Sequence, residues 1–423
     1  MIMKRFALTA TCLVLAAAGG PAAAQDAPAP APVARPAAPP PVPQLGEGPW
    51  DVLTTDAKLR VEVLTRGLDH PWGLVFLPDG GMLVTERPGR LRVIRDGVLD
   101  PQPIEGLPPI FAPGIAGLTD IVLDPDFARN RLIYLAYSKA DPEAGPNPTP
   151  QVNSTLAVMR AKWDGGHRLS EVEDIFVADA WYGKPPLPPK CCGQGPAFGS
   201  FGGRMAIGGD GKLYVTSGDR NFGEKVQDPS NHFGKILRLN LDGSAPQDNP
   251  FVGREGWKPE IWTLGHRNPT GLTFDPATGR LWESEFGPRG GDEVNLIERG
   301  ANYGWMDVTQ GYHYNGEPAK GVRGVEGMTD PKWAFGPPSG NPGNLAIYRG
   351  GLLPAWQGDL LLPTMSRYLV RMELSPGGHV VAMERMLENL GQRLRDVRVD
   401  PDGAVYVLTD ETAGALLKIT PAP

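Results

Sequence analysis

The sequence has few cysteines, few histidines, no cluster of basic residues and no long apolar run beyond its N-terminus. Its 423 residues include 3 Cys and 6 His, and 41 Lys and Arg stand against 48 Asp and Glu, for a formal net charge of −7. A mildly acidic chain without basic runs is a poor candidate for binding nucleic acid or an anionic membrane surface. The absence of an apolar stretch of about 20 residues past the N-terminus excludes a spanning helix there. No nucleotide-binding loop, histidine-rich zinc set or thiol–histidine pair is present.

Glycine and proline are abundant instead. The chain has 55 Gly and 46 Pro, roughly twice the usual share. Apolar residues make up 41% and charged residues 21%, which is enough to bury a large core and excludes wholesale disorder. Length alone suggests two or three domains, but all-β folds often form a single unit of this size.

The N-terminus has the pattern of a secretory signal peptide. Lys4 and Arg5 precede an apolar run from Phe6 to Ala18, and the small residues Ala22–Ala24 fit a cleavage site before Gln25. We therefore expect residues 1–24 to be removed and the protein to be exported, to a bacterial periplasm. An amphipathic or buried helix is the alternative interpretation.

A Pro/Ala-rich segment follows the expected cleavage site. Residues 25–48 are predicted to form an extended linker, so the folded domain spans residues 49–423. The mature chain then keeps only Cys191 and Cys192, too few for a disulfide framework. These two residues either form a strained vicinal disulfide or remain as thiols.

A polar turn followed by alternating apolar residues recurs along the chain. Asp-Gly and Asp-Pro turns between alternating segments are hairpin signals, because such turns need residues that tolerate unusual backbone angles. The copies lie at residues 77–85, 124–135, 209–216, 275–282, 357–362 and 401–407.

These repeats predict an all-β, six-bladed β-propeller. Their spacing is long for a blade but compatible with loop insertions, and a radial arrangement of antiparallel sheets closes the fold without a long exposed edge. A two-sheet sandwich is the structural alternative. Propellers bind ligands at the central channel, so we expect site residues to be scattered along the sequence.

The segment from Gly202 to Trp305 holds the densest set of candidate ligands. Gly287 and Pro288 lie in a turn that can direct backbone carbonyls at a hard cation. Asp292, Glu293 and Tyr303 add oxygen ligands, which favours calcium over zinc. Adjacent acids in a Gly-rich loop that are simply solvated are the alternative.

Two further pairs carry guanidinium groups. Arg267 and Asn268 offer a planar fork and an amide, suited to a carboxylate-rich or quinone-oxygen ligand, or to a structural salt bridge. Arg393 and Arg395 alternate on one expected strand and so face the same side, where they repel each other unless an anion lies between them.

Several long motifs, in order, resemble the soluble aldose sugar dehydrogenases of the glucose/sorbosone dehydrogenase family. The similarity covers about residues 55–420. It is carried by GGRMAIGGDGKLYVTSGDR, FGKILRLNLDGSAPQDNPF, EIWTLGHRNPTGLTF, SEFGPRGGDEVNLIERGANYGW and QRLRDVRVDPDGAVYVLTDETAGALLKI. Members are six-bladed propellers that bind pyrroloquinoline quinone (PQQ) and calcium, oxidise the anomeric hydroxyl of aldoses to lactones and pass electrons to a soluble acceptor.

The resemblance implies roles for individual residues. Gly287 and Pro288 match the carbonyl ligands of the calcium that holds the quinone, and Asp292, Glu293 and Tyr303 match a second, structural calcium site. Arg267 and Asn268 match quinone contacts. Arg393 and Arg395 match the pair that binds the quinone carboxylates, where two arginines offset an anion and calcium polarises the quinone.

The sequence departs from the family at four positions. The family's general base is a His where this chain has Ser200, and a hydroxyl is a poor base near neutral pH. Polar cofactor contacts expected at three other positions are replaced by Ile115, Thr270 and Ser366. His70 or His232 is a substitute base only if folding brings it into the channel.

The sequence thus predicts a PQQ- and calcium-dependent oxidoreductase acting on an aldose or related alcohol, with Ser200 and Arg267 as candidate catalytic residues and Thr270 as a further cofactor contact. We expect a monomer or homodimer that transfers electrons to a soluble acceptor and binds neither nucleic acid nor membrane. A non-catalytic or ligand-binding propeller and a calcium-dependent lactonase-type hydrolase are the alternatives.

Overall fold

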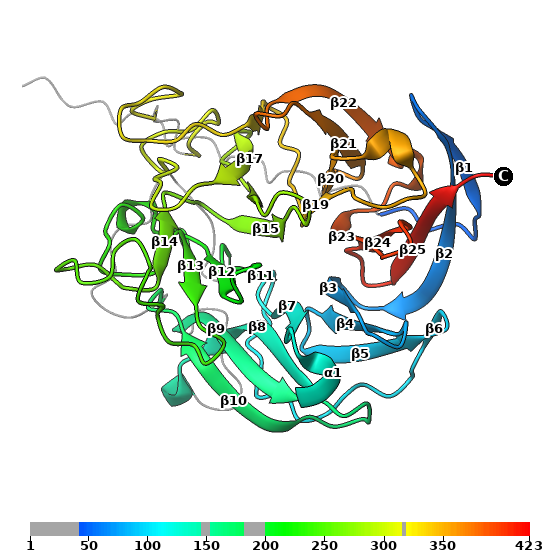
Figure 1. The fold of residues 1–423 in the computed structure, drawn as a ribbon, viewed down its shortest axis with the longest axis horizontal. Helices are drawn as coiled ribbons and strands as arrows, with labels where there is room; N and C mark the ends of the chain where they lie inside the picture. Colours follow the sequence, from blue (N-terminus) through cyan, green and yellow to red (C-terminus); the bar gives the residue numbers. More distant parts are fainter. Residues whose placement is uncertain (1–41, 145–152, 182–198, 315–318) are drawn as a thin grey trace, which may run out of the picture. The chain divides into compact units, whose positions relative to one another are not determined.

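The computed structural model describes residues 42–144, 153–181, 199–314 and 319–423 (Figure 1). In this part of the chain the structure is nearly all β, with six antiparallel sheets. One short helix, α1 (Phe127–Asn130), lies in a turn, and brief 3-10 segments lie at Pro142–Ala144, Gly223–Lys225, Pro354–Trp356 and Glu388–Leu390. Five sheets have four strands and one has five. The six-bladed propeller is confirmed, and the two-sheet sandwich is excluded.

The blades follow one another in sequence. The first blade contains β3 (Pro71–Phe76), β4 (Met82–Glu86), β5 (Arg90–Arg95) and β6 (Val98–Leu99). The second contains β7 (Leu118–Leu123), β8 (Leu132–Ala140), β9 (Ser154–Lys162) and β10 (Ser170–Val177). The third contains β11 (Gly202–Ile207), β12 (Leu213–Ser217), β13 (Lys235–Leu239) and β14 (Ile261–Leu264). The fourth blade contains β15 (Pro269–Phe274), β16 (Leu281–Glu285), β17 (Asp292–Ile297) and β18 (Trp333–Phe335). The fifth contains β19 (Ala346–Ile347), β20 (Leu360–Pro363), β21 (Leu369–Leu374) and β22 (Val380–Met386).

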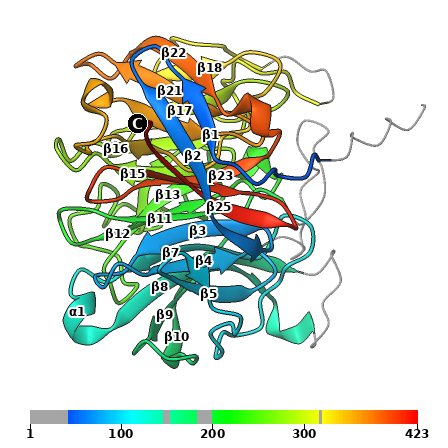
Figure 2. The same cartoon turned by 90° about the vertical axis from the view of Figure 1, so that its right-hand side faces the viewer.

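The last blade joins the two ends of the domain. It contains β23 (Leu394–Val399), β24 (Val405–Thr409) and β25 (Gly414–Pro421), followed in the sheet by β2 (Lys58–Leu68) and β1 (Trp50–Leu53). The pairing of β2 with β25 runs from Leu59–Pro421 to Leu68–Gly414, and the two strands lie side by side in Figure 2. This pairing joins the N-terminal and C-terminal parts of the domain in one sheet and so closes the ring of blades.

The repeated turns are the hairpins that join the first and second strands of each blade. All six copies found in the sequence occupy this same position, from β3–β4 to β23–β24. In the first copy, Asp79 Oδ1 accepts a hydrogen bond from the Gly81 N–H at 3.0 Å, and Gly80 has φ of +85°. Gly211 has φ of +70° in the third copy, a backbone angle that other residues adopt at a cost.

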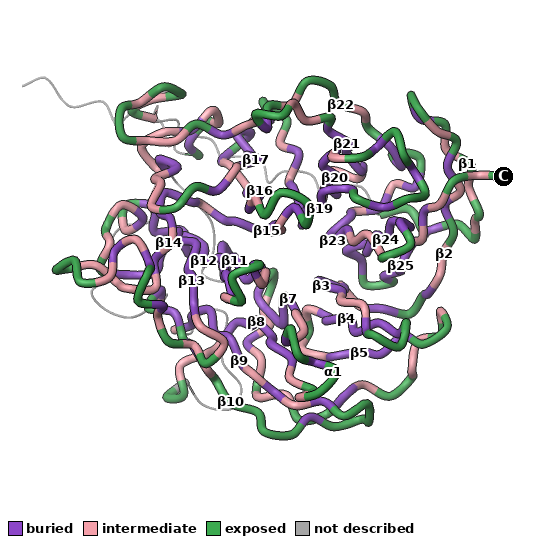
Figure 3. Tube along the Cα trace, in the orientation of Figure 1, coloured by how far each residue is buried: buried purple, intermediate pink, exposed green. Residues whose placement is uncertain are grey.

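The innermost strands pack around the central axis and expose little. β3, β7, β11, β15 and β23 each begin with four buried residues, and each contacts the innermost strand of the neighbouring blade. In Figure 3 the buried segments concentrate along the strands of the blades, and the exposed ones lie mainly in the peripheral turns. Apolar clusters between the blades supply the core, with Trp282 and Trp356 among the largest fully buried side chains.

Some predicted features fall outside the described residues. The expected signal peptide, most of the expected linker and the Cys191–Cys192 pair lie there. Of the linker residues that are described, Leu45 is buried against the last blade, and the Pro43 carbonyl accepts a hydrogen bond from Gln392 Nε2 at 2.6 Å. Among the described residues, no helix is long and apolar enough to cross a membrane.

Candidate functional site

A cavity of about 640 Å³ lies where loops from all six blades meet at one end of the channel. Most of the residues predicted from the sequence line it. These are Ile115, Ser200, Arg267, Asn268, Thr270, Gly287, Arg393 and Arg395. The ring of blades therefore gathers residues that are up to 280 positions apart into one site.

The remaining predicted residues lie beside this cavity rather than in its wall. Pro288, Glu293 and Tyr303 line a small adjacent space. Ser366 donates a hydrogen bond to the Ser339 carbonyl at 2.8 Å and accepts one from Asn341 Nδ2 at 3.0 Å, and both of those partners line the main cavity.

One wall of the cavity is strongly cationic. Arg393 and Arg395 both face it, as expected from their alternation, and each pairs with a carboxylate of the same chain. Arg393 Nη2 pairs with Glu411 at 3.1 Å, and Arg395 Nη2 pairs with Asp410. Burial opposes ionisation of Asp410, but Arg395, His70 and Arg87 hold its pKa well below the ordinary range. Arg395 Nε has no hydrogen-bond partner among the described residues.

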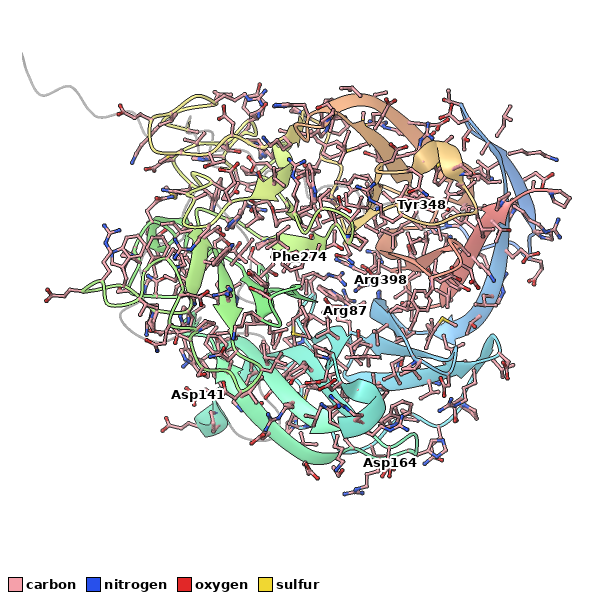
Figure 4. All side chains as sticks on the ribbon, in the orientation of Figure 1. Arg87, Asp141, Asp164, Phe274, Tyr348 and Arg398 are labelled. Atoms are coloured by element: carbon pink, nitrogen blue, oxygen red, sulfur yellow. The ribbon has the colours of Figure 1, made fainter. Side chains whose placement is uncertain are left out.

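Arg87 is a third guanidinium on this wall, and no motif in the sequence pointed to it. It follows β4 and projects to the middle of the ring in Figure 4. Its guanidinium makes no side-chain hydrogen bond within the described residues, and the charges that act on it are not hydrogen-bonded to it. Burial and the nearby Arg395 and Arg393 lower its pKa, while Asp410 acts in the opposite direction. The donors of this side chain are thus available to a ligand.

A fourth guanidinium lies across the cavity. Arg267 Nη1 donates to the Phe286 carbonyl at 3.0 Å, and its guanidinium lies 5.6 Å from the Trp305 ring centre. Asn268 Oδ1 accepts from the Gly202 N–H at 3.1 Å, which fixes the amide orientation. The hydroxyl of Thr270 donates to the Pro342 carbonyl of the next blade at 2.9 Å.

Ser200 borders the cavity, and a segment that carries a buried acid packs beside it. Ser200 adopts a left-handed conformation with φ of +52°, and its carbonyl accepts a hydrogen bond from the Arg220 N–H at 3.2 Å. The neighbouring Asp219 is fully buried: its Oδ2 accepts from Trp305 Nε1 at 2.8 Å, and its Oδ1 accepts from the Asn221 N–H at 2.8 Å. Burial raises the pKa of Asp219, an effect that Arg267 partly offsets.

An ion network lies at the centre of the channel. Arg204 of β11 is fully buried, with Nη1 3.1 Å from Asp120 Oδ1 and 3.5 Å from Asp396 Oδ1. Arg398, labelled near the centre of Figure 4, pairs with both acids at 3.2 Å. The Arg204 guanidinium also stacks over the Trp72 ring at 3.9 Å, and Trp72 lines the cavity. The paired charges connect three blades beside the site, and the Trp72 ring adds a fourth.

Neither histidine proposed as a substitute base lines the cavity. His70 Nδ1 lies 2.9 Å from Asp410 Oδ1, and His70 is not among the residues that line the cavity. His232 accepts from the Asp179 N–H through Nδ1 and lies 3.3 Å from Glu260 through Nε2. Within the described residues, the cavity lining contains no histidine.

A buried acidic cluster lies behind the cavity. Asn295 Nδ2 lies within hydrogen-bond distance of Glu283 (2.9 Å), Glu293 (3.2 Å) and Glu285 (3.3 Å). The described residues offer no hydrogen-bond partner to Glu283 Oε1 or Asn295 Oδ1. Burial and repulsion by Glu285 raise the pKa values of Glu283 and Glu293 well above the ordinary range. Buried oxygens with unfilled lone pairs and surplus negative charge fit a hard cation such as calcium.

Asp292 and Tyr303 engage the backbone around this cluster. Asp292 Oδ1 accepts from the Gly287 N–H at 2.8 Å, and Oδ2 accepts from the Asn341 N–H at 2.7 Å, so the carboxylate shapes the turn. The Tyr303 hydroxyl donates to the Leu296 carbonyl at 2.6 Å, and its ring stacks on His266. Calcium ligation by these two side chains remains a prediction.

The chain is similar to known proteins over most of its length. A family model described as glucose/sorbosone dehydrogenase matches residues 68–418. The aldose sugar dehydrogenase YliI of Escherichia coli (strain K12) is 38% identical over 368 residues, covering 86% of this chain and 94% of the relative. Quinoprotein glucose dehydrogenase B of Acinetobacter calcoaceticus is 29% identical over 433 residues, covering 84% and 86%. The solved PQQ-bound form of an aldose sugar dehydrogenase from Streptomyces coelicolor has a TM-score of 0.68 at 26% identity, covering 86% of this chain and 98% of that one.

Proposed function

This chain belongs to the glucose/sorbosone dehydrogenase family, and we propose from that premise that it is a quinoprotein oxidoreductase with PQQ and calcium as cofactors. Its substrate is an aldose or a related alcohol, and oxidation at the anomeric hydroxyl gives the lactone. The quinone, when bound, supplies the hydride acceptor, and calcium supplies polarisation of the quinone oxygen.

The observation that supports this proposal is the surplus of guanidinium donors in the cavity. Arg87, Arg267, Arg393 and Arg395 face one space, and Arg87 and Arg395 Nε have donors that no described residue fills. A planar ligand with several carboxylates can accept hydrogen bonds from these donors, because guanidinium groups bind carboxylates through paired, charge-assisted hydrogen bonds. Apolar surface from Trp72 and other lining residues suits the ring system of the same ligand.

The residues around the turn at Gly287 fit the second cofactor. Gly287 lines both the main cavity and the small adjacent space, and Pro288 and Glu293 also line that space. In our proposal the carbonyls of Gly287 and Pro288 hold the calcium next to the quinone. Glu293 contributes, with its acidic neighbours, to a structural calcium site behind it.

The location and partners of the enzyme are also proposals. The signal-peptide pattern supports export to the periplasm, where a soluble acceptor takes the electrons from the reduced cofactor. We expect a monomer or homodimer.

A reconstitution assay tests the function. Protein loaded with calcium and PQQ is mixed with an electron-accepting dye and a panel of aldoses and simple alcohols. We expect at least one aldose to reduce the dye, and we expect omission of PQQ or removal of calcium by a chelator to abolish the rate. Hydrolysis of a lactone by the quinone-free protein, without dye reduction by any substrate, would contradict the proposal.

A further inference from the structure

The mouth of the cavity differs in character from its cationic wall. Of the described residues that line the cavity, only Ile115 and Tyr314 are exposed, with 53% and 41% of their surface accessible. These two residues therefore form the rim that a substrate meets as it enters. Both present mainly carbon atoms to the solvent, because one side chain is aliphatic and the other is a phenol ring.

Both rim residues are fixed by the fold. Ile115 lies in a turn between β6 and β7, where the Ala116 N–H donates to the Pro113 carbonyl at 3.1 Å. Tyr314 lies in the segment between β17 and β18, and the Arg289 guanidinium lies 5.4 Å from its ring centre. Closure of the ring of blades thus brings two apolar side chains from distant segments to one rim.

The apolar surface continues inward from the rim. Phe286 and Met365 are half-buried and line the cavity as well. Phe286 precedes Gly287 in the chain, so this surface extends to the turn that the proposed function assigns to calcium. A substrate that reaches this turn from solvent passes along apolar side chains.

Several polar lining side chains already donate their hydrogen bonds to the protein. The hydroxyls of Thr119 and Thr270 donate to carbonyl groups of the chain, both at 2.9 Å, and Asn341 Nδ2 donates to Ser366 at 3.0 Å. These donors are not available to the hydroxyl groups of a sugar. A substrate hydroxyl that leaves water without a new partner lowers the affinity, so the lining disfavours a heavily hydroxylated substrate.

We propose that Ile115 and Tyr314 determine substrate specificity, and that the preferred substrate is an aldose with an alkyl or aryl group on an oxygen remote from its anomeric carbon. This inference rests on the proposed function and names the substrate class. The anomeric end of the sugar has to enter the cavity to be oxidised, so the remote end lies at the rim. An apolar substituent at that end is removed from water by contact with both side chains, whereas a free hydroxyl gains nothing from them.

The test compares D-glucose with 4-O-benzyl-D-glucose in the dye assay of the calcium- and PQQ-loaded protein. The two sugars share the anomeric hydroxyl and differ only at O4, which lies opposite the anomeric carbon in the pyranose ring. We expect kcat/KM of the wild type to be at least about tenfold higher for the benzyl ether. The gain should come from a lower KM with a similar kcat, because the rim contacts are the same before and during the reaction.

Substitutions at the rim should remove this preference. We expect Ile115→Thr to lower the ratio of the two kcat/KM values about tenfold, because it replaces an ethyl group by a hydroxyl. Tyr314→Ala should lower the ratio at least as much, and Tyr314→Phe should keep it, because the ring makes the contact. The kcat for D-glucose should stay within about twofold in all three variants.

A binding measurement separates recognition from chemistry. Methyl 4-O-benzyl-β-D-glucoside has a blocked anomeric oxygen and cannot be oxidised to the lactone. In calorimetric titrations of the loaded wild type, its Kd should be at least about tenfold lower than that of methyl β-D-glucoside. Ile115→Thr should abolish this difference, and its Kd for PQQ, followed by absorbance, should not increase.

Val381→Thr is the matched control. Val381 is 59% exposed on β22 and is not among the residues that line the cavity. This variant also replaces exposed apolar surface by a hydroxyl, and we expect it to keep the wild-type ratio and the wild-type difference in Kd.

The outcomes distinguish this inference from the proposed function. A wild type that oxidises neither sugar in a quinone-dependent reaction overturns both. An active wild type without a preference for the benzyl ether, or a preference that survives both Ile115→Thr and Tyr314→Ala, overturns the specificity assignment alone.

Discussion

Replacing Arg87 by Gln should weaken quinone binding while leaving the fold intact. The guanidinium faces the cavity and makes no hydrogen bond to described residues, so its removal breaks no contact of the fold. The substitution should instead reduce the binding free energy of the quinone. A hydrogen bond to a charged group contributes about 1.5–3 kcal/mol, which corresponds to an increase of roughly 10- to 150-fold in the Kd for PQQ.

The assay is an absorbance titration with PQQ in saturating calcium, accompanied by thermal unfolding of the unliganded protein. The Tm of Arg87→Gln should equal or slightly exceed that of the wild type, because the substitution removes the cost of burying the charge and the repulsion by Arg395 and Arg393, which together outweigh the lost attraction to Asp410. Arg168→Gln is the control, since it removes one positive charge at an exposed position next to Glu105. An unchanged Kd for Arg87→Gln, or an equal loss in Arg168→Gln, would refute the reasoning.

Three further predictions concern calcium and buried acids. Glu293→Gln should raise the Tm without calcium, because it relieves repulsion in the acidic cluster, and should shrink the Tm rise on adding calcium. Gly287→Ala should destabilise the turn and weaken calcium binding, measured by calorimetry, because a Cβ there would lie 2.2 Å from the Gly291 carbonyl oxygen. Burial raises the pKa of Asp359 to about 6, so its contribution to stability falls as pH rises from about 4 to 6. The free energy of unfolding of Asp359→Asn, measured with urea, should therefore exceed that of the wild type by about 1–2 kcal/mol at pH 8 and equal it at pH 4. Equal effects of Asp359→Asn at both pH values, or a calcium response unchanged by Glu293→Gln or Gly287→Ala, would contradict the corresponding prediction.

The fold was predictable because its repeat is local. Each blade begins with a hairpin whose turn residues have a backbone requirement, and Asp79–Gly81 shows how an Asp side chain and a positive-φ glycine meet it. The candidate ligands in the motif segment were predictable for a similar reason, since Arg267, Asn268 and Gly287 lie at strand ends that face the channel.

The contacts between blades were not predictable in this way. Arg87 follows an ordinary strand, and only closure of the ring brings it beside Arg393 and Arg395. Asp410 likewise lies at a strand end, with no local signal that it would pair with Arg395 and His70. The position of the family's histidine drew attention to Ser200, but the sequence could not show that Ser200 adopts a positive φ or that its carbonyl binds the Arg220 N–H.

Titration of the calcium-loaded protein with PQQ, followed by absorbance, tests the central claim most directly. We predict saturable binding with one quinone per chain, lost when Arg393 and Arg395 are both replaced by Gln, because the cationic wall holds the ligand's carboxylates. Absence of saturable binding, or binding unaffected by that double replacement, would contradict the account.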